Sequence, residues 1–182
     1  MLSMQNFVYD GHPILRQVAK EVKIPLSDED KEIMRLILEY IKNSQNEKLA
    51  KKYKLREGIG LAAPQIGLDK RIFAIHVEDE DGVLHSHMLA NPKLVSHSED
   101  LIYLPGGEGC LSVKEEIEGI VPRYRRVKIT GYNENSELIE IKANGFIAIV
   151  LQHEYDHLNG KMFYDHINPQ FPHIPPTGAV SI

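Results

Sequence analysis

The sequence of 182 residues has one cysteine, no excess of positive charge and no long hydrophobic run. With a single cysteine the chain cannot form an internal disulfide, which indicates a reducing compartment. The formal net charge is −5, and the lack of a basic excess argues against direct binding to nucleic acid. No apolar stretch is long enough to span a bilayer, and no signal peptide is evident at the N-terminus. We therefore expect a cytoplasmic protein that binds neither membranes nor nucleic acid directly.

What the sequence does contain is the balance of an ordinary globular protein. Hydrophobic residues make up 42% and charged residues 26% of the chain. The length suffices for one domain with a hydrophobic core, and no internal repeat is present. We expect a single domain over residues 1–182 that ends in a proline-rich tail, with Pro169, Pro172, Pro175 and Pro176.

An HExxH pattern over residues 153–157 is the most informative motif in the chain. Two histidines four positions apart lie on one face of a helix, so His153 and His157 can bind one divalent metal ion. Glu154 follows the first histidine and is placed to act as a general base on water. The alternative is a solvated His-Glu-His stretch on a surface helix, and the apolar run before the motif argues against it.

The flanking residues predict the helix that this motif requires. Asn144-Gly145 is a plausible N-cap, residues 146–151 are all apolar, and Gly160 lies where a glycine commonly ends a helix. Because apolar residues occupy nearly all sides of the helix before the motif, we expect the helix to be buried.

The third metal ligand is not evident downstream of the motif. A metzincin would carry its next histidine at position 163, which is Phe163, and the nearby alternatives are Asp165 and His166. The one cysteine, Cys110, lies in a glycine-rich segment (106–112), and glycines provide few side-chain atoms to cover its thiol. A thiolate, two imidazoles and a water make a four-coordinate catalytic site. We predict Cys110 as the third ligand rather than as a small buried hydrophobe.

A second glycine-rich segment, residues 58–67, matches the sequence of the GxGxxA dinucleotide-binding fingerprint but not the strand–turn–helix context that the fingerprint requires. The charged residues before it do not form a buried strand, and Pro64 and another expected strand occupy the place of the nucleotide-binding helix. Glycines that let a second backbone approach closely explain this segment better.

Three segments together match a known family. GIGLAAPQ (58–65), EGCLS (108–112) and QHEYDH (152–157) resemble the signature motifs of peptide deformylases, in the form usual in Gram-positive bacteria. The resemblance covers nearly the whole chain and implies a hydrolase that removes the N-formyl group from the formylmethionine of newly made polypeptides. A zincin-like metallopeptidase is the alternative, weakened by the missing downstream ligand. A structural metal site in a binding module would leave Glu154 without a role.

The resemblance also implies roles for individual positions. It implies one ferrous iron per chain, replaceable by zinc, nickel or cobalt, on Cys110, His153 and His157. It implies catalytic roles for Glu154 as general acid/base and for the oxyanion donors, the Gln65 side chain and the Leu111 N–H. It implies substrate binding by Ile59, Gly60, Gly109, Phe146, Ile149 and Val150. Glu108 and Arg123 resemble an ion pair that steadies the cysteine loop. The implied partners are N-formylmethionyl nascent peptides and, transiently, the ribosome, and we expect a monomer.

Local patterns predict the fold class. Ser27 caps an amphipathic helix whose apolar residues, from Ile33 to Ile41, lie on one face. Strands are expected at residues 71–77, 84–95, 117–121, 126–132 and 137–142, with hairpin turns at Gly82 and residues 133–136. This order predicts an α+β fold in which mainly antiparallel sheets pack around a buried C-terminal helix that carries HExxH.

Overall fold

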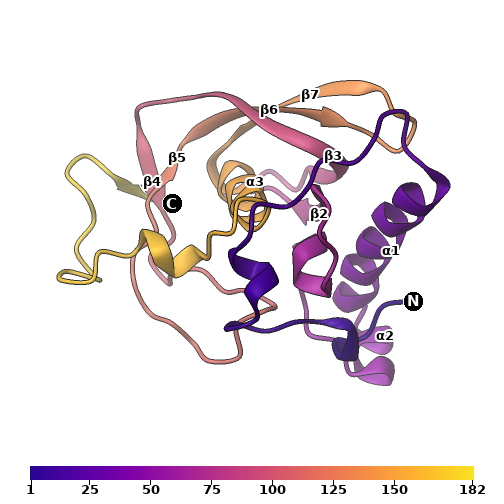
Figure 1. The fold of residues 1–182 in the computed structure, drawn as a ribbon. Coiled ribbons are helices and arrows are strands. Elements are labelled where there is room, and N and C mark those ends of the chain that lie inside the picture. The colour runs from indigo at the N-terminus through magenta and orange to yellow at the C-terminus, as the bar shows by residue number, and fades with distance from the viewer.

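A five-stranded antiparallel sheet in the order β1-β2-β3-β6-β7 forms the centre of the computed structural model, which describes residues 1–182 (Figure 1). Its strands are β1 (Gly60–Ala62), β2 (Ile72–Glu78), β3 (Leu84–His97), β6 (Arg126–Tyr132) and β7 (Leu138–Asn144). The turn between β2 and β3 uses Gly82 at φ +76°, a conformation that suits glycine. β1 is an edge strand, because it pairs with β2 on one side only.

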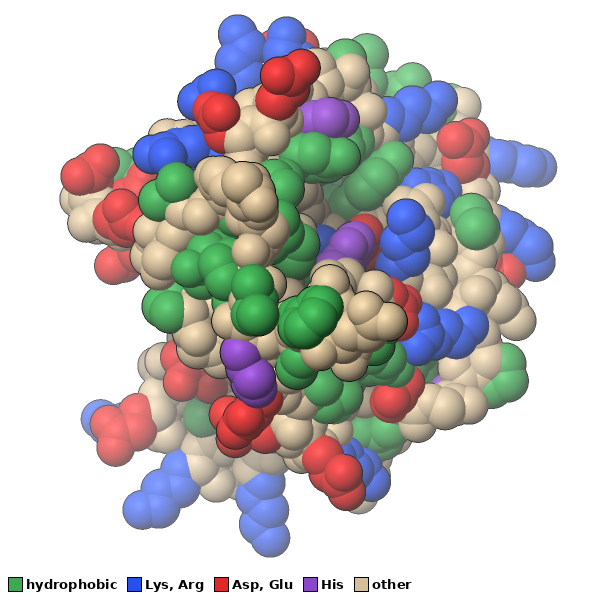
Figure 2. All heavy atoms as spheres, turned by 90° about the vertical axis from the view of Figure 1, so that its left-hand side faces the viewer, with side chains coloured by type: hydrophobic (Ala, Val, Ile, Leu, Met, Phe, Trp, Pro, Cys, Tyr) green, Lys and Arg blue, Asp and Glu red, His purple; other side chains and the backbone are tan.

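A second, smaller sheet in the order β5-β4-β8 holds the two ends of the cysteine loop. Its strands are β4 (Leu101–Tyr103), β5 (Arg123–Tyr124) and β8 (Val180–Ser181). The loop of residues 104–122 leaves β4 and returns to β5, and these strands pair antiparallel. β8, from the proline-rich tail, adds to β4 in parallel. Figure 2 faces the tail side of the molecule and shows hydrophobic side chains gathered there; the exposed ones in the tail are Phe171, Ile174 and Val180.

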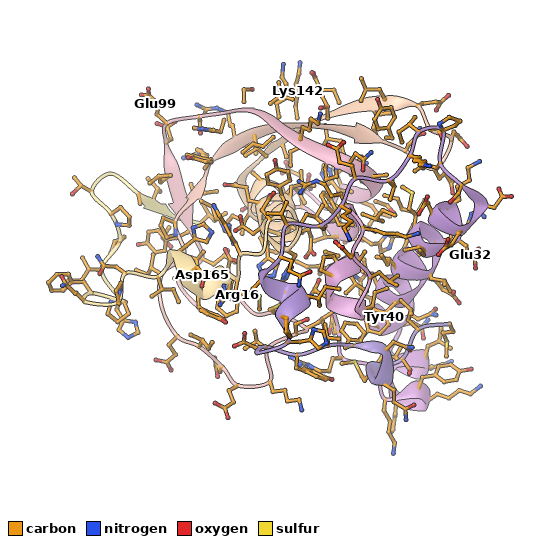
Figure 3. All side chains as sticks on the ribbon, viewed as in Figure 1. Arg16, Glu32, Tyr40, Glu99, Lys142 and Asp165 are labelled. Atoms are coloured by element: carbon orange, nitrogen blue, oxygen red, sulfur yellow. The ribbon has the colours of Figure 1, made fainter.

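Helix α1 (Asp28–Gln45) packs its apolar face against β1, β2 and β3, as its pattern predicted. The Ser27 hydroxyl accepts a hydrogen bond from the Asp30 N–H at 3.1 Å, which satisfies one of the free donors of the first turn. Tyr40, on the inner face of α1, is fully buried (Figure 3). A short helix, α2 (Glu47–Tyr53), follows α1 and was not predicted.

Helix α3 (Gly145–His157) carries the HExxH motif and lies within the fold, in contact with β1, β2, β5, β6 and β7 (Figure 1). Its residues 147–151 are all buried, as the apolar run predicted. Asn144 precedes the helix, but its side chain makes no capping hydrogen bond. Gly160 has φ +68°, and a Cβ there would lie 2.6 Å from the Arg16 backbone carbonyl, so glycine is required. The fold class is therefore confirmed.

Four 3₁₀ turns complete the chain: η1 (Met4–Asn6), η2 (Pro13–Arg16), η3 (Ala63–Ile66) and η4 (Phe163–His166). An ion pair between Arg16 and Asp165 links η2 to η4 (Figure 3). None of the helices combines the length and the hydrophobicity needed to cross a bilayer.

The expected strand at residues 117–121 is wrong. These residues belong to the cysteine loop, and the Ile120 N–H donates to the Pro172 carbonyl of the tail instead of to a strand. Their apolar side chains, Ile117 and Val121, pack in a small cluster under the loop, which explains a strand-like pattern without strand pairing. β3 also runs two residues further than expected, to His97.

Candidate metal centre

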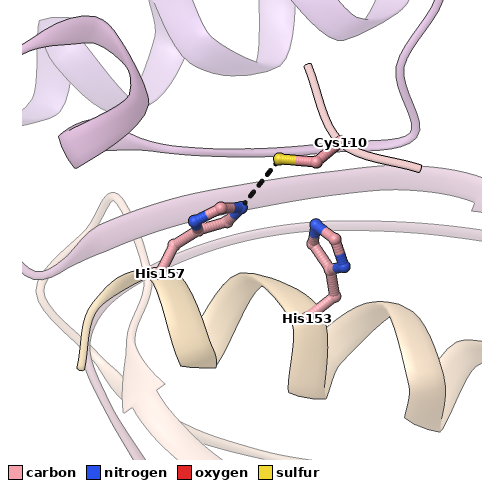
Figure 4. Close-up of side chains that lie close together, drawn as sticks. All are labelled: Cys110, His153 and His157. Carbon is pink, nitrogen blue, oxygen red and sulfur yellow. Dashed lines mark hydrogen bonds between the residues drawn. The ribbon is translucent and has the colours of Figure 1, made fainter. Parts of the chain in front are cut away.

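Helix α3 and the cysteine loop bring three possible metal ligands together. His153 and His157 lie one turn apart on α3, and Cys110 faces them from the loop (Figure 4). Their ligand atoms lie within 4.8 Å of one another, and the Cys110 Sγ lies 3.3 Å from the His157 Nε2. The glycine-rich setting indicated a poorly buried thiol, but Cys110 is only 9% exposed. The histidines and the cluster under the loop cover it.

A buried carboxylate orients the first histidine. The Glu108 Oε2 lies 2.8 Å from the His153 Nδ1, which leaves the His153 Nε2 as the nitrogen free for a metal. Arg123 donates two hydrogen bonds to Glu108, at 2.8 and 2.9 Å, and another to Asp156 of α3. The expected ion pair of Glu108 and Arg123 is thus confirmed. Through its second salt bridge, to Asp156, Arg123 connects the loop to the helix, and both Arg123 and Glu108 are buried.

The chemistry of these donors fits a divalent metal ion. Although burial opposes ionisation, the neighbouring His157 and His153 lower the pKa of Cys110 to about 5, so that the thiolate is present at neutral pH. One thiolate and two imidazoles suit borderline metals such as iron and zinc. Two buried side-chain atoms have no hydrogen-bond partner, the Glu154 Oε2 and the His157 Nδ1. An unpaired buried carboxylate oxygen beside such donors fits a site that receives water or substrate.

The Glu154 carboxylate lies in the space that is free because residue 60 is a glycine. A Cβ at Gly60 would lie 2.3 Å from the Glu154 Oε1, so a side chain at this position would displace the carboxylate. Burial raises the pKa of Glu154 to about 7, which suits a group that takes and returns a proton near neutral pH. Gly60 therefore has a steric role beside its expected role in substrate binding.

Two hydrogen-bond donors lie close to the cysteine. The Gln65 Oε1 accepts from the Ala62 N–H at 2.8 Å, which turns the Gln65 Nε2 toward the Cys110 Sγ at 3.5 Å. The Leu111 N–H donates to no group of the protein. Both donors can therefore reach a group bound beside the cysteine.

These residues surround a cavity of about 440 Å³. The six expected substrate-binding positions all line it: Ile59, Gly60, Gly109, Phe146, Ile149 and Val150. The expected catalytic and metal-binding residues that also line it are Gln65, Cys110, Leu111, His153 and Glu154. Arg56, which also lines the cavity, was missed, because an arginine within a run of charged residues gives no sequence signal.

A family model described as polypeptide deformylase matches residues 4–172. The chain belongs to the polypeptide deformylase family. It is therefore a hydrolase of a metal-dependent family, and it holds a Cys/His/His group able to bind a metal ion. Similar curated deformylases come from Gram-positive bacteria. Peptide deformylase 2 of Bacillus subtilis is 53% identical over 100% of this chain and 99% of its own. The peptide deformylase of Halalkalibacterium halodurans is 54% identical over 92% of both chains.

Solved deformylase structures share the fold. The plant peptide deformylase 1B of Arabidopsis thaliana superposes with a TM-score of 0.72 at 31% identity, over 90% of this chain and 82% of that one. The peptide deformylase of Thermus thermophilus superposes with a TM-score of 0.70 at 30% identity, over 91% and 86% of the two chains. The deformylase fold thus extends to relatives much less similar in sequence.

Proposed function

We propose that the protein removes the formyl group from the N-terminal formylmethionine of nascent polypeptides, at a metal centre made by Cys110, His153 and His157. The observation that carries this proposal is the convergence of three metal donors within 4.8 Å of one another, at a cavity that Cys110, His153 and Glu154 line. A zincin-like metallopeptidase would use the same helix motif, but the matching family model and the similar curated proteins are deformylases.

The residues around the cavity have separate roles in the proposed hydrolysis. When bound, the metal ion supplies Lewis-acid polarisation of the reacting groups. Glu154 takes the proton of the attacking water and returns it to the departing amine. The Gln65 amide and the Leu111 N–H donate to the oxygen that becomes negative, and such a donor contributes about 3 kcal/mol.

The edge strand β1 positions the peptide. Its outer side carries no partner strand and borders the cavity, so an extended peptide can add to the sheet there through backbone hydrogen bonds. The methionine side chain then enters the apolar part of the cavity beside Phe146, Ile149 and Val150, where its burial contributes roughly 1.5–3 kcal/mol.

We further propose ferrous iron as the metal in the cell, with zinc, nickel or cobalt as substitutes. Ferrous iron and its thiolate ligand both oxidise readily, the cysteine through sulfenic and sulfinic acid. The iron-loaded enzyme should therefore lose activity in air much faster than the nickel-loaded enzyme. Equal half-lives of the two forms, measured on the same preparation, would contradict this choice of metal.

The proposed substrate also indicates where the enzyme acts and with which partner. Formylated chains are made on the ribosome, so we propose transient association with it, in the cytoplasm, by a monomer whose residues 1–182 act as one domain. Co-sedimentation with ribosomes that carry a nascent chain tests the association, and light scattering tests the monomer.

The deciding experiment compares three substrates at equal concentration. We expect formate release from an N-formyl-Met peptide, far slower hydrolysis of the matching N-acetyl-Met peptide, and no cleavage of internal bonds in an unformylated peptide. The expectation follows from the family, in which the site accepts a formyl hydrogen but not a longer acyl chain. Internal cleavage at a rate comparable to deformylation would establish the metallopeptidase instead.

A further inference from the structure

Arg56 ties the glycine-rich segment to the cysteine loop. Its guanidinium donates to the Leu111 carbonyl at 3.1 Å, to the Val113 carbonyl at 3.2 and 3.3 Å, and to the Cys110 carbonyl at 3.4 Å. All of these hydrogen bonds end on backbone oxygens within residues 110–113. A planar, forked cation is well suited to hold several acceptors in one arrangement.

One of these acceptors shares a peptide group with a proposed catalytic donor. The Cys110 carbonyl and the Leu111 N–H belong to the same planar unit, so a bond that fixes the oxygen also fixes the direction of the N–H. A positive charge on the oxygen side also polarises the peptide, which strengthens the N–H as a donor. The hydrogen bond to the Leu111 carbonyl holds the next peptide group as well.

The loop has no regular structure at this point, and Arg56 adds to two other hydrogen bonds that hold its backbone: the Val113 N–H donates to the Cys110 carbonyl at 3.1 Å, and the Asp10 N–H donates to the Ser112 carbonyl at 2.8 Å. Residues 104–122 contain no helix or strand, and cavities of about 440 and 280 Å³ lie beside the loop, both lined by Arg56 and Cys110. The backbone of Arg56 is itself fixed, since the buried Tyr40 hydroxyl donates to its carbonyl at 2.9 Å. A Cβ at Gly58 would lie 2.7 Å from the Leu111 Cδ1, so the two segments are in close contact.

We propose that Arg56 is a positioning residue for deformylation: it orients the peptide group between Cys110 and Leu111 so that the Leu111 N–H meets the developing oxyanion. The inference rests on the proposed function, in which this N–H is an oxyanion donor. If Arg56 only stabilised the fold, its loss would lower the melting temperature and leave kcat unchanged. If it mainly placed the thiolate, its loss would lower the metal content.

The test uses the metal-loaded enzyme and three variants: Arg56→Gln, Arg56→Lys and, as a control, Lys54→Gln. Lys54 is exposed and two residues away, and its loss removes the same charge without touching the loop. We expect Arg56→Gln to lower kcat by roughly tenfold to hundredfold, less than the 10²–10³ lost when an oxyanion donor is removed. KM for a formyl-Met peptide and metal content should change little. Arg56→Lys should recover part of kcat, and Lys54→Gln should match the parent.

A thioformyl-Met peptide separates oxyanion positioning from general damage. Sulfur is a weak hydrogen-bond acceptor, so the ratio of parent to variant kcat should shrink to a few-fold on this substrate. An equal ratio on both substrates, an unchanged kcat, or metal loss in proportion to activity would each overturn the proposal. Should Arg56→Gln not fold, the same ratio for Arg56→Lys decides. A parent enzyme that releases no formate would instead refute the proposed function.

Discussion

The helix side and the loop side of the metal centre hold their ligands by different means. His153 and His157 are placed by the repeat of α3, whose backbone hydrogen bonds are made within the helix. Cys110 lies in a segment without regular structure, and its position depends on the salt bridge between Glu108 and Arg123 and on packing against the cluster under the loop, while Arg56 orients the peptide group that follows it. A helix thus fixes ligands locally, whereas a loop needs side chains from distant parts of the chain.

Removing the ligand of the loop side should have the largest effect. We expect Cys110→Ala to lose most of its bound metal and all measurable deformylation, because two imidazoles alone leave the site short of its third protein ligand. Metal analysis of the purified variant, together with formate release, measures both. A variant that keeps one metal per chain would show that the loop does not supply a ligand.

A substitution of Glu154 on the helix side should separate the catalytic step from metal binding. Glu154→Gln keeps the size of the side chain and removes the base, so we expect kcat to fall by about 10²–10⁴ with metal content unchanged. Steady-state kinetics and metal analysis on one preparation test this. Loss of metal would make Glu154 a ligand, and near-normal turnover would remove it from the mechanism.

The link between the two sides can be broken at Arg123. This side chain is 3% exposed, and Arg123→Gln would remove the guanidinium that pairs with both Glu108 and Asp156, leaving each carboxylate with only a histidine beside it. Breaking a buried pair in this way costs about 3–5 kcal/mol. The melting temperature should fall by roughly 10 °C for a chain of this size. Arg35→Gln is the control, since its ion pairs are exposed and should contribute less than about 1 kcal/mol. Equal shifts for the two variants would contradict the proposed importance of the link.

Acid should weaken the same link without any mutation. Although burial opposes ionisation, Arg123 and His153 lower the pKa of Glu108 to about 2, below its ordinary value of 4.5. A depressed pKa means that the ionised form stabilises the fold, so the contribution is complete above pH 4.5 and is lost as the pH falls toward 2. We expect a loss on the order of 3 kcal/mol over this range. Chemical denaturation at several pH values tests it, and the loss should be smaller in Arg123→Gln.

Sequence patterns predicted the helix side better than the loop side. The apolar run and the HExxH spacing fixed α3 within a few residues, because helical periodicity is local. The strand expected at 117–121 was wrong, and β1, β4, β5 and β8 were missed, because strands of two or three residues depend on pairing with distant segments. The tether from Arg56 has no sequence signal, since it joins residues more than 50 positions apart. Cys110 was predicted as a ligand, but its burial was not.

The open edge of β1 also affects how the protein behaves at high concentration. An uncovered strand can template the growth of sheets between molecules. β1 has only three residues, and η3 begins directly after it; Pro64, the second residue of η3, cannot donate to a neighbouring strand. The edge is therefore long enough to hold the first residues of a peptide but too short to recruit a second sheet. A deformylase can in this way offer free backbone groups to its substrates at an edge that is too short for sheet growth.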